Sequence, residues 1–353
     1  VSYLAKSQVH DLFLSWLTIL EYNITDIYPV SACERHCRTC VLLARNSCKL
    51  QGCLVKFNYE ALWSDIALRM LMNTVSHPIE YAKVLIQIGY EPIAPRPTTT
   101  FSGQPALTLP NVFQYGKYIK NVDGFTGCYR GLIPKLCSYT VSAVAFEKTS
   151  KCIKFEDDQK RKKCIYELIR ELISRMIGII VSHPLDVIAL RMMAQFVGGE
   201  TKYNGLFRSF VEVYKENGIM GYYAGLVPRL IGNAAVLILV SSSTYAIDKY
   251  IISDREFKPN VVSTMRFIAT TITYPFLVVS HCMAVNNCGL IAGLPPQMPI
   301  YNGWLDCWSH LSTTNQLKRG NRLFWRYYTG PQVIINGKPI AISKYNFHLQ
   351  STT

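Results

Sequence analysis

The sequence predicts an all-α membrane protein, and two observations support that prediction. Beyond residue 60 the chain holds five long, mostly apolar stretches, each close to the roughly 20 residues that a helix needs to cross a bilayer. A proline-containing motif and a glycine-rich motif also recur along these stretches. A soluble protein with buried helices stays open as an alternative, because several of the stretches carry charges near their ends.

The five predicted helices can be bounded by their breaker residues. The first ends at Gly89, before a proline-rich loop over residues 91–110. The second has Pro134 near its start, where a missing N–H group costs little, and the third stops at Gly198. The five expected ranges are Ala61–Ile88, Leu132–Ile153, Tyr166–Phe196, Pro228–Tyr250 and Val261–Val285.

A sixth helix is hard to find in the sequence. After Gly320 the chain has one short apolar run at residues 323–328, and Gly330, Pro331 and Gly337 then interrupt it. No stretch there approaches membrane length. We therefore expect the sixth helix to be missing or degenerate, and one sequence does not distinguish a lost helix from a damaged carboxyl terminus.

Residues 1–59 form a cysteine-containing leader of unknown role, for which disorder is one interpretation. The leader lacks both the order of a signal peptide and the Arg-rich character of a transit peptide. Cys33, Cys37 and Cys40 would supply zinc ligands, but no second tight pair follows at finger spacing. We expect no metal and no cofactor.

Composition restricts the classes of function. The chain has 37 Lys and Arg against 23 Asp and Glu, a net charge of +14, which suits anionic membranes, anionic solutes or nucleic acid. It shows no folded nucleic-acid signature and no enzyme motif such as a Walker loop or a nucleophile elbow. The 12 cysteines lack the dense spacing of a secreted scaffold, which favours a reducing compartment. We expect neither an enzyme nor a nucleic-acid-binding protein.

A glycine-rich motif repeats without a gap. The segment from Asp123 to Leu136 aligns with the segment from Asn217 to Leu230 at an offset of 217 − 123 = 94 residues. Such self-similarity indicates an internal structural repeat. The recurring glycines of this turn are Gly124, Gly127 and Gly131 in the first copy and Gly218, Gly221 and Gly225 in the second.

A proline motif recurs on the first helix of each unit. Pro78 returns as Pro184 and more faintly as Pro275, and each should kink its helix. Amphipathic connecting segments, such as the one after Gly205, predict short helices between the long ones. The chain then divides into repeat 1 (60–154), repeat 2 (164–252), a degenerate repeat 3 (260–330) and a tail (331–353).

These paired motifs resemble those of the mitochondrial carrier family over residues 61–328. Pro78-x-Glu80-x-x-Lys83 has the full family signature, and Asp123-Gly124-x-x-Gly127-x-Tyr129-Arg130-Gly131 is similar to its companion. The resemblance implies a pseudo-threefold bundle of six helices around a central cavity. It also implies that the signature acids and bases form ion pairs that close one face.

Most of those gate charges are absent here. Repeat 2 keeps Asp186 but has Ala189 at the position of the base, and repeat 3 has Leu277 and Ser280. We expect such a gate to close poorly. A charge at the bilayer centre costs roughly 2.5 to 3.5 kcal/mol unless it faces a partner or water. We therefore hypothesise a polar groove lined by Glu80, Lys83, Asp186, Arg191, Asn286 and Asn287. For Arg191 and the two asparagines, a role at a helix end or in a loop stays open as the alternative, because polar residues collect at membrane boundaries.

The departures resemble one branch of that family, the mitochondrial carrier homologs. The resemblance implies the outer mitochondrial membrane, with the inner membrane as the alternative. It further implies an insertase or scaffold that handles tail-anchored and other helical membrane proteins in the lipid bilayer, with a link to apoptotic regulators. A solute transporter of the carrier type and a non-catalytic docking platform remain as alternatives.

Overall fold

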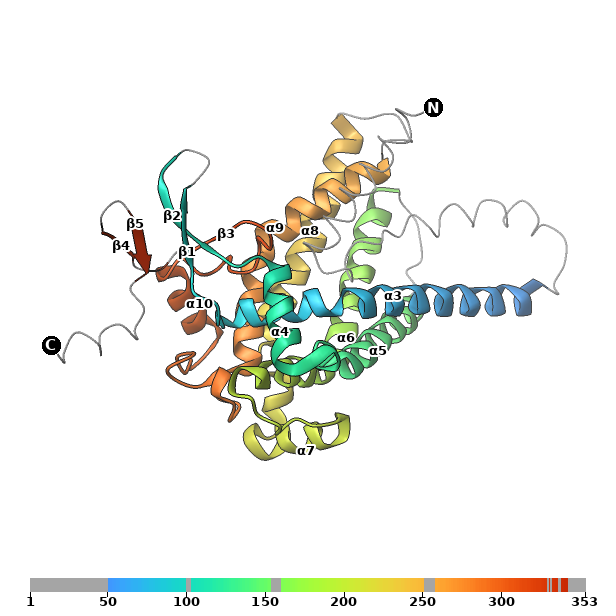
Figure 1. Cartoon of the computed structure of the whole chain (residues 1–353). Helices are drawn as coiled ribbons and strands as arrows, with labels where there is room; N and C mark the ends of the chain where they lie inside the picture. Colours follow the sequence, from blue (N-terminus) through green and yellow to red (C-terminus); the bar gives the residue numbers. More distant parts are fainter. Residues whose placement is uncertain are drawn as a thin grey trace, which may run out of the picture. The chain divides into compact units, whose positions relative to one another are not determined.

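The computed structural model describes residues 50–99, 103–153, 160–250, 258–328, 330, 332–335 and 338–341. Most of the leader, with its candidate zinc ligands, and the tail beyond residue 341 lie outside the described residues. The long helices are α3 (Leu50–Ile88), α5 (Leu132–Cys152), α6 (Lys160–Ala194), α8 (Leu226–Tyr250) and α9 (Lys258–Val285) (Figure 1). The all-α fold class is therefore confirmed.

A short helix follows the first long helix of each repeat, as the repeat pattern predicts. The three short helices are α4 (Val112–Gly127), α7 (Leu206–Asn217) and α10 (Trp304–Thr313). On α7 three large apolar side chains are exposed, with Phe207 84%, Val211 52% and Tyr214 58% exposed, whereas Ser209 and Val213 on the opposite face are buried. An exposed apolar face on a short helix suits the boundary between headgroups and acyl chains.

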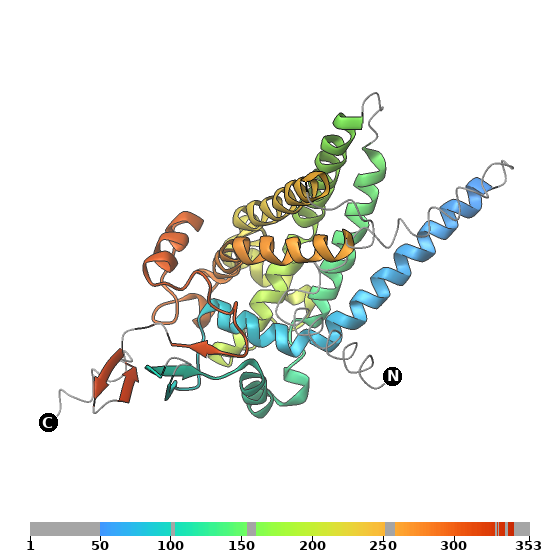
Figure 2. The same cartoon turned by 90° about the horizontal axis from the view of Figure 1, so that it is seen from above.

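Prolines lie inside the three helices that the motif predicts, namely Pro78 in α3, Pro184 in α6 and Pro275 in α9. Figure 2 shows α3 as one long helix. The chain forms two compact units, and each of these helices contributes its N-terminal part to unit 1 and its C-terminal part to unit 2. The change of unit occurs within two residues of each proline.

Unit 1 contains residues up to His77, Leu132–Asp186 and Leu226–Phe276. Its helices contact one another in chain order. The hydroxyl of Tyr139 on α5 accepts a hydrogen bond from Arg69 on α3 at 2.8 Å. Small residues allow close approach elsewhere, since a Cβ at Gly178 of α6 would lie 3.1 Å from an α5 carbonyl oxygen. A Cβ at Gly232 of α8 would likewise lie 3.0 Å from Phe276 of α9.

Unit 2 contains Pro78–Gly131, Val187–Gly225 and Leu277–Thr353, and within it the C-terminal halves of α3, α6 and α9 all meet. Tyr81 of α3 donates to the carbonyl of Met193 on α6 at 3.4 Å, and Arg191 of α6 donates to the carbonyl of Ala284 on α9 at 3.0 Å. A hydrogen bond of 2.7 Å between His281 and Gln87 joins α9 back to α3.

The expectation of poor closure is wrong for this unit. The helix halves that meet there bury Tyr81, Ile188 and Val279 completely. Gly131 packs against the carbonyl of Ala189, and Gly225 against the carbonyl of Ser280, so both positions that lost the signature base lie under a turn glycine. Apolar burial and close backbone packing take the place of the ion-pair ring.

The turn motif has the same local geometry in both copies. Gly124 and Gly218 have φ values of 76° and 62°, and Gly131 and Gly225 have φ values of 82° and 77°. These values lie in the region that residues with a Cβ rarely adopt. The equivalence at an offset of 94 residues supports the repeat on structural grounds.

Three of the five predicted spans are apolar enough to cross a membrane by length and composition. Among the described residues these are Ile165–Gly198, Ile219–Ile247 and Val262–Val285. The helices α3 and α5 are long enough, at 39 and 21 residues. However, charges such as Arg69 and Glu80 in α3 and Lys135 and Glu147 in α5 make them more polar. All five predicted helices are therefore long enough to cross a membrane. Only three of them are also apolar enough to do so.

Short strands occur where the sequence indicates only loops. β1 (Arg96–Thr99), β2 (Pro105–Leu109) and β3 (Arg326–Tyr327) form one antiparallel sheet (Figure 1). β4 (Gln332–Ile335) and β5 (Lys338–Ala341) form a separate hairpin. Within the described part of residues 286–341, α10 is the longest helix, at 10 residues, so no sixth helix of membrane length follows α9 there.

Candidate functional site

A buried ion pair lies at the signature acid of repeat 2. Asp186 is 4% exposed near the proline of α6, and its carboxylate is 2.7 Å from the guanidinium of Arg229 on α8. Lys135 on α5 is close enough for its charge to act on the same carboxylate. Unit 1 therefore holds a cluster of two cations around one acid, built by three helices.

The two cations occupy equivalent places in the repeats. Lys135 follows Pro134 and Arg229 follows Pro228, at the same offset of 229 − 135 = 94 residues. Sequence reasoning missed their role because the signature motif directs attention to the proline helices. The signal was present in the aligned glycine-rich segments, where both copies end in a proline followed by a cation and a leucine.

The signature pair of repeat 1 lies in unit 2. Lys83 is 4% exposed, whereas Glu80 is only partly buried. Both side chains have polar or electrostatic interactions within the structure. A buried ammonium needs such compensation because removing it from water is costly.

Arg191 is buried and hydrogen-bonded rather than exposed to an open groove. Its side chain is completely buried in unit 2. Besides the carbonyl of Ala284, its guanidinium reaches the hydroxyl of Tyr203 at 3.4 Å. That hydroxyl in turn donates to the carbonyl of Cys288 at 3.3 Å. Arg191 therefore links the end of α6 to the backbone after α9.

The two asparagines after α9 also contact backbone. The side chain of Asn286 donates to the carbonyl of Tyr301 at 2.8 Å and accepts from its N–H at 3.1 Å. Asn287 is exposed and has a positive φ of 48°. Its carbonyl accepts a hydrogen bond from Asn217 at 3.0 Å. Five of the six groove candidates lie in unit 2 and Asp186 in unit 1.

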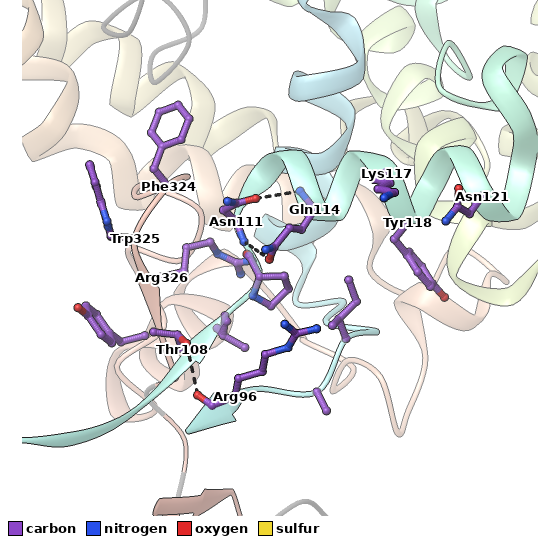
Figure 3. A pocket seen from close by; sticks show the side chains of 15 residues that line it. Arg96, Thr108, Asn111, Gln114, Lys117, Tyr118, Asn121, Phe324, Trp325 and Arg326 are labelled. Carbon is purple, nitrogen blue, oxygen red and sulfur yellow. Dashed lines mark hydrogen bonds between the residues drawn. The ribbon is translucent and has the colours of Figure 1, made fainter. Parts of the chain in front are cut away.

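A separate pocket of about 480 Å³ lies within unit 2. Its walls are β1, β2, α4 and the segment that contains β3, and Figure 3 shows Arg96 and Arg326 beside the amides of α4. The lining includes three cations and no carboxylate. Arg326 pairs with Glu91 next to the pocket, and burial raises the pKa of that carboxyl. None of the predicted groove residues lines this pocket.

Metal binding has no support in the part of the chain that the structure describes. No cluster of three or more His, Cys, Asp or Glu side chains there could hold an ion. The cysteine group of the leader falls outside the described residues.

Comparison with known proteins connects this architecture to a family. A model described as mitochondrial carrier protein matches residues 160–254. The chain is 40% identical over 282 residues to mitochondrial carrier homolog 2 of Bos taurus, covering 74% of this chain and 93% of the relative. It is 37% identical over 303 residues to mitochondrial carrier homolog 1 of Mus musculus, 76% of each chain. A mitochondrial 2-oxodicarboxylate carrier of Rattus norvegicus is 29% identical over 182 residues, 49% of this chain and 56% of the relative.

Proposed function

The chain belongs to the mitochondrial carrier family, with the carrier homologs as relatives, and from that premise we propose that it inserts helical proteins into the outer mitochondrial membrane. Membership makes it a carrier-like protein of a mitochondrial membrane. The further steps, insertion and the choice of the outer membrane, are the proposal. Its clients are tail-anchored proteins and other proteins with one apolar helix and a short polar end.

The observation that carries the proposal is the unfinished row of helices. In unit 1 the contacts run from α3 to α5 and from α5 to α6, and then through Asp186 and Arg229 to α8 and from α8 to α9. The described residues after α9 add no further long helix to this row. A closed ring of six helices would block lateral movement into lipid. We propose that a substrate helix leaves sideways at the place where the sixth helix of such a ring would lie.

The packing of unit 2 supports the same proposal over solute exchange. An exchanger has to open each face in turn. Opening unit 2 would expose completely buried side chains such as Tyr81 and Ile188 and would break the backbone contacts of Gly131 and Gly225. No ring of signature ion pairs exists there to be reversibly broken, since the base positions hold Ala189 and Ser280.

The polar side chains would compensate the polar end of a substrate while that end crosses the membrane. A substrate's polar end has no water to bind in hydrocarbon, and each unsatisfied group costs several kcal/mol. The Asp186 cluster offers a carboxylate and two cations for exchange with that end, while the apolar helix moves sideways into lipid. Of the remaining groove candidates, Lys83 and Glu80 are proposed as polar lining, whereas the contacts of Arg191 and Asn286 support structural roles.

Insertion into liposomes that hold only this purified protein tests the proposal. A tail-anchored substrate should become protected from protease above the level in empty liposomes. With protein that is folded and present in both orientations, protection no greater than in empty liposomes would refute unaided insertion.

The Lys83→Glu variant should change the insertion rate, because it places a second acid beside Glu80. We expect a change of at least about tenfold, which corresponds to roughly 1.4 kcal/mol in the barrier. Lys215→Glu makes the same chemical change on α7 at a side chain that is 63% exposed and should leave the rate unaltered. Equal rates for wild type and Lys83→Glu would remove Lys83 from the polar lining.

A docking platform is the second candidate, and it needs no groove charges. Full tolerance of substitutions at Lys83 and Asp186 would favour it, and recruitment of apoptotic regulators would then be its proposed role. A solute exchanger is supported only by the repeat signatures that survive, and radiolabelled solute uptake by the same liposomes tests it.

A further inference from the structure

The pocket beside α4 is built by segments that lie far apart in the chain. β1 pairs with β2 so that Arg96 lies opposite Thr108, and β2 pairs with β3 so that Leu109 lies opposite Arg326. The hydroxyl of Thr108 also donates to the carbonyl of Arg96 at 3.3 Å. The sheet therefore brings two arginines to one cavity of about 480 Å³, a volume typical of small-molecule sites.

Two cations give this pocket an excess of positive charge. Arg326 is already compensated, since it pairs with Glu91 next to the pocket. Arg96 on β1 and Lys117 on α4 also line the pocket, and both are exposed. Among the described residues neither of these two forms an ion pair. Cations without carboxylate partners on a concave surface attract anions.

The amide side chains at the start of α4 add hydrogen-bond donors. Oδ1 of Asn111 accepts from the N–H of Gln114 at 2.8 Å, and Oε1 of Gln114 accepts from the N–H of Asn111 at 3.3 Å. With both oxygens occupied, each side chain presents its NH₂ group, which only donates. Figure 3 shows Arg96 and Arg326 beside these amides. This part of the pocket offers mainly donors, which suits a ligand with several acceptor oxygens.

An aromatic wall lies beside these donors. Phe324 and Trp325 line the pocket, and their ring centroids are 6.4 Å apart. Phe113 on α4 extends this wall, with its ring centroid 5.7 Å from that of Phe324. Trp325 is 68% exposed and Phe113 is 58% exposed, so contact with the carbon part of a ligand would remove apolar surface from water.

We propose that this pocket binds a phosphate monoester, with the phosphate against Arg96 and Lys117 and the carbon part against Trp325. A phosphate group has three strong acceptor oxygens that point in different directions, which fits donors from β1, α4 and the segment of β3. A carboxylate has two oxygens in one plane and fits this set less well. The same chemistry occurs in soluble phosphate esters and in the headgroup of phosphatidic acid. The inference goes beyond the proposed function, because none of the predicted groove residues lines this pocket.

Calorimetric titration of the full chain in detergent tests the proposal. Phenyl phosphate is the soluble ester, and phthalate, an aromatic dicarboxylate of the same charge, is its control. Dihexanoyl phosphatidic acid is the lipid ester, and dihexanoyl phosphatidylcholine, which has no net charge, is its control. We expect at least one ester to bind saturably and at least about tenfold more tightly than its control.

The two esters distinguish the two sources of the phosphate. Binding of phenyl phosphate indicates a soluble ester, whereas binding of phosphatidic acid alone indicates a lipid headgroup. Binding of neither ester, or equal binding of each ester and its control, would overturn the proposal. The measurement involves no insertion, so its outcome is independent of the proposed function.

Single substitutions separate the pocket from the general positive charge of the chain. Arg96→Gln and Lys117→Gln should each weaken ester binding at least about fivefold, because each removes one charge-assisted hydrogen bond. Trp325→Ala should weaken it at least about threefold through the lost aromatic contact. Lys120→Gln changes an exposed lysine of α4 that does not line the pocket and should leave the affinity unaltered. Equal affinities for Lys117→Gln and Lys120→Gln would contradict a defined site.

Discussion

Gly225 shows how one residue without a side chain permits the packing of unit 2. A Cβ at this position would lie 2.3 Å from the carbonyl oxygen of Ser280, and its φ is 77°. That oxygen belongs to a packed helix, so it has no room to move. The Ser280 hydroxyl also donates to the Gly225 carbonyl at 2.8 Å. The contact occupies the place of the lost signature base, which explains a small residue there.

The Gly225→Ala variant should lose about 3 kcal/mol of stability, from strained backbone and overpacking together. Thermal unfolding of the protein in detergent measures the loss. Gly199→Ala is the matched control, since its φ is 62° and no atom lies within 4 Å of the added Cβ; it should lose roughly 1 kcal/mol. Equal melting temperatures for the two variants would mean that the Ser280 contact is not tight.

Asp186→Asn should destabilise unit 1, because it removes the carboxylate that compensates Arg229. We expect a loss of about 2 kcal/mol, below the usual cost of breaking a buried pair because Arg229 is 21% exposed. Asp123→Asn breaks a pair of the same length, 2.7 Å, whose side chains are 24% and 20% exposed, and should lose less than about 1 kcal/mol. Chemical denaturation compares the two, and similar losses would argue against the burial of Asp186 as the cause.

Residue-level prediction from sequence succeeded where the chain repeats itself. Two of the three aligned glycines in each copy have a positive φ, namely Gly124 and Gly131 in the first copy and Gly218 and Gly225 in the second. Glycine adopts this backbone conformation most easily, so the residue type indicates the turn. The pairing of Asp186 with Arg229 was not predictable in this way. Arg229 lies on α8, the second long helix of repeat 2, whereas the signature motif covers only the proline helix α6. For Arg191 the sequence left a groove role and a helix-end or loop role open, because it lies two residues after the position of the signature base. Its hydrogen bond to the carbonyl of Ala284 supports the second role.

At the scale of elements, the segment after α10 is held by long-range contacts rather than by a helix. Arg326 is 7% exposed, pairs with Glu91 and donates to the carbonyl of Pro110 at 3.0 Å. In the sheet, β3 pairs with β2 through Leu109 and Arg326. The sequence showed only a proline-rich loop and an aromatic run. Strands this short have no local period, and the partner of β3 lies more than two hundred residues away in the chain.

Arg326→Ala should release this segment. Loss of the buried ion pair and of the hydrogen bond that Arg326 donates to the Pro110 carbonyl should raise the open population at least about tenfold. Limited chymotrypsin digestion measures the rise as faster cleavage between Phe324 and Tyr328. Arg322→Ala changes an exposed arginine of the same segment and should leave the cleavage rate as in wild type. If both variants are cleaved at the wild-type rate, Arg326 does not hold the strand.

At the scale of the whole molecule, the predictable part of the fold is its helical repeat. The long helices, the prolines inside three of them and the short connecting helices all follow from residue spacing. The closure of unit 2 did not follow, because counting charges at signature positions ignores the apolar side chains and glycines that pack there. How many helices cross the bilayer also depends on the whole molecule, since α3 and α5 combine membrane length with charges that neighbouring helices can compensate, as Tyr139 does for Arg69.

Five spans and three spans predict different topologies. With five, the connection from α3 to α5 and the connection from α6 to α8 lie on the same side of the membrane. With three, α3 and α5 stay on one side, and the two connections lie on opposite sides. Unit 2 contains both connections, and α3 bears an exposed stripe of Leu68, Leu71 and Val75 at helical spacing that suits lipid.

We therefore expect five spans. A protease site placed after Gly103 and another after Gly205 measure the arrangement in sealed membranes. Cleavage of both sites from the same face is the expected result, with a site after Cys152 cleaved only once the membrane is opened. Cleavage of the first two sites from opposite faces would establish three spans. The row of helices in unit 1 would then lack its first two members in the bilayer, and a lateral exit between α9 and α3 would have no basis.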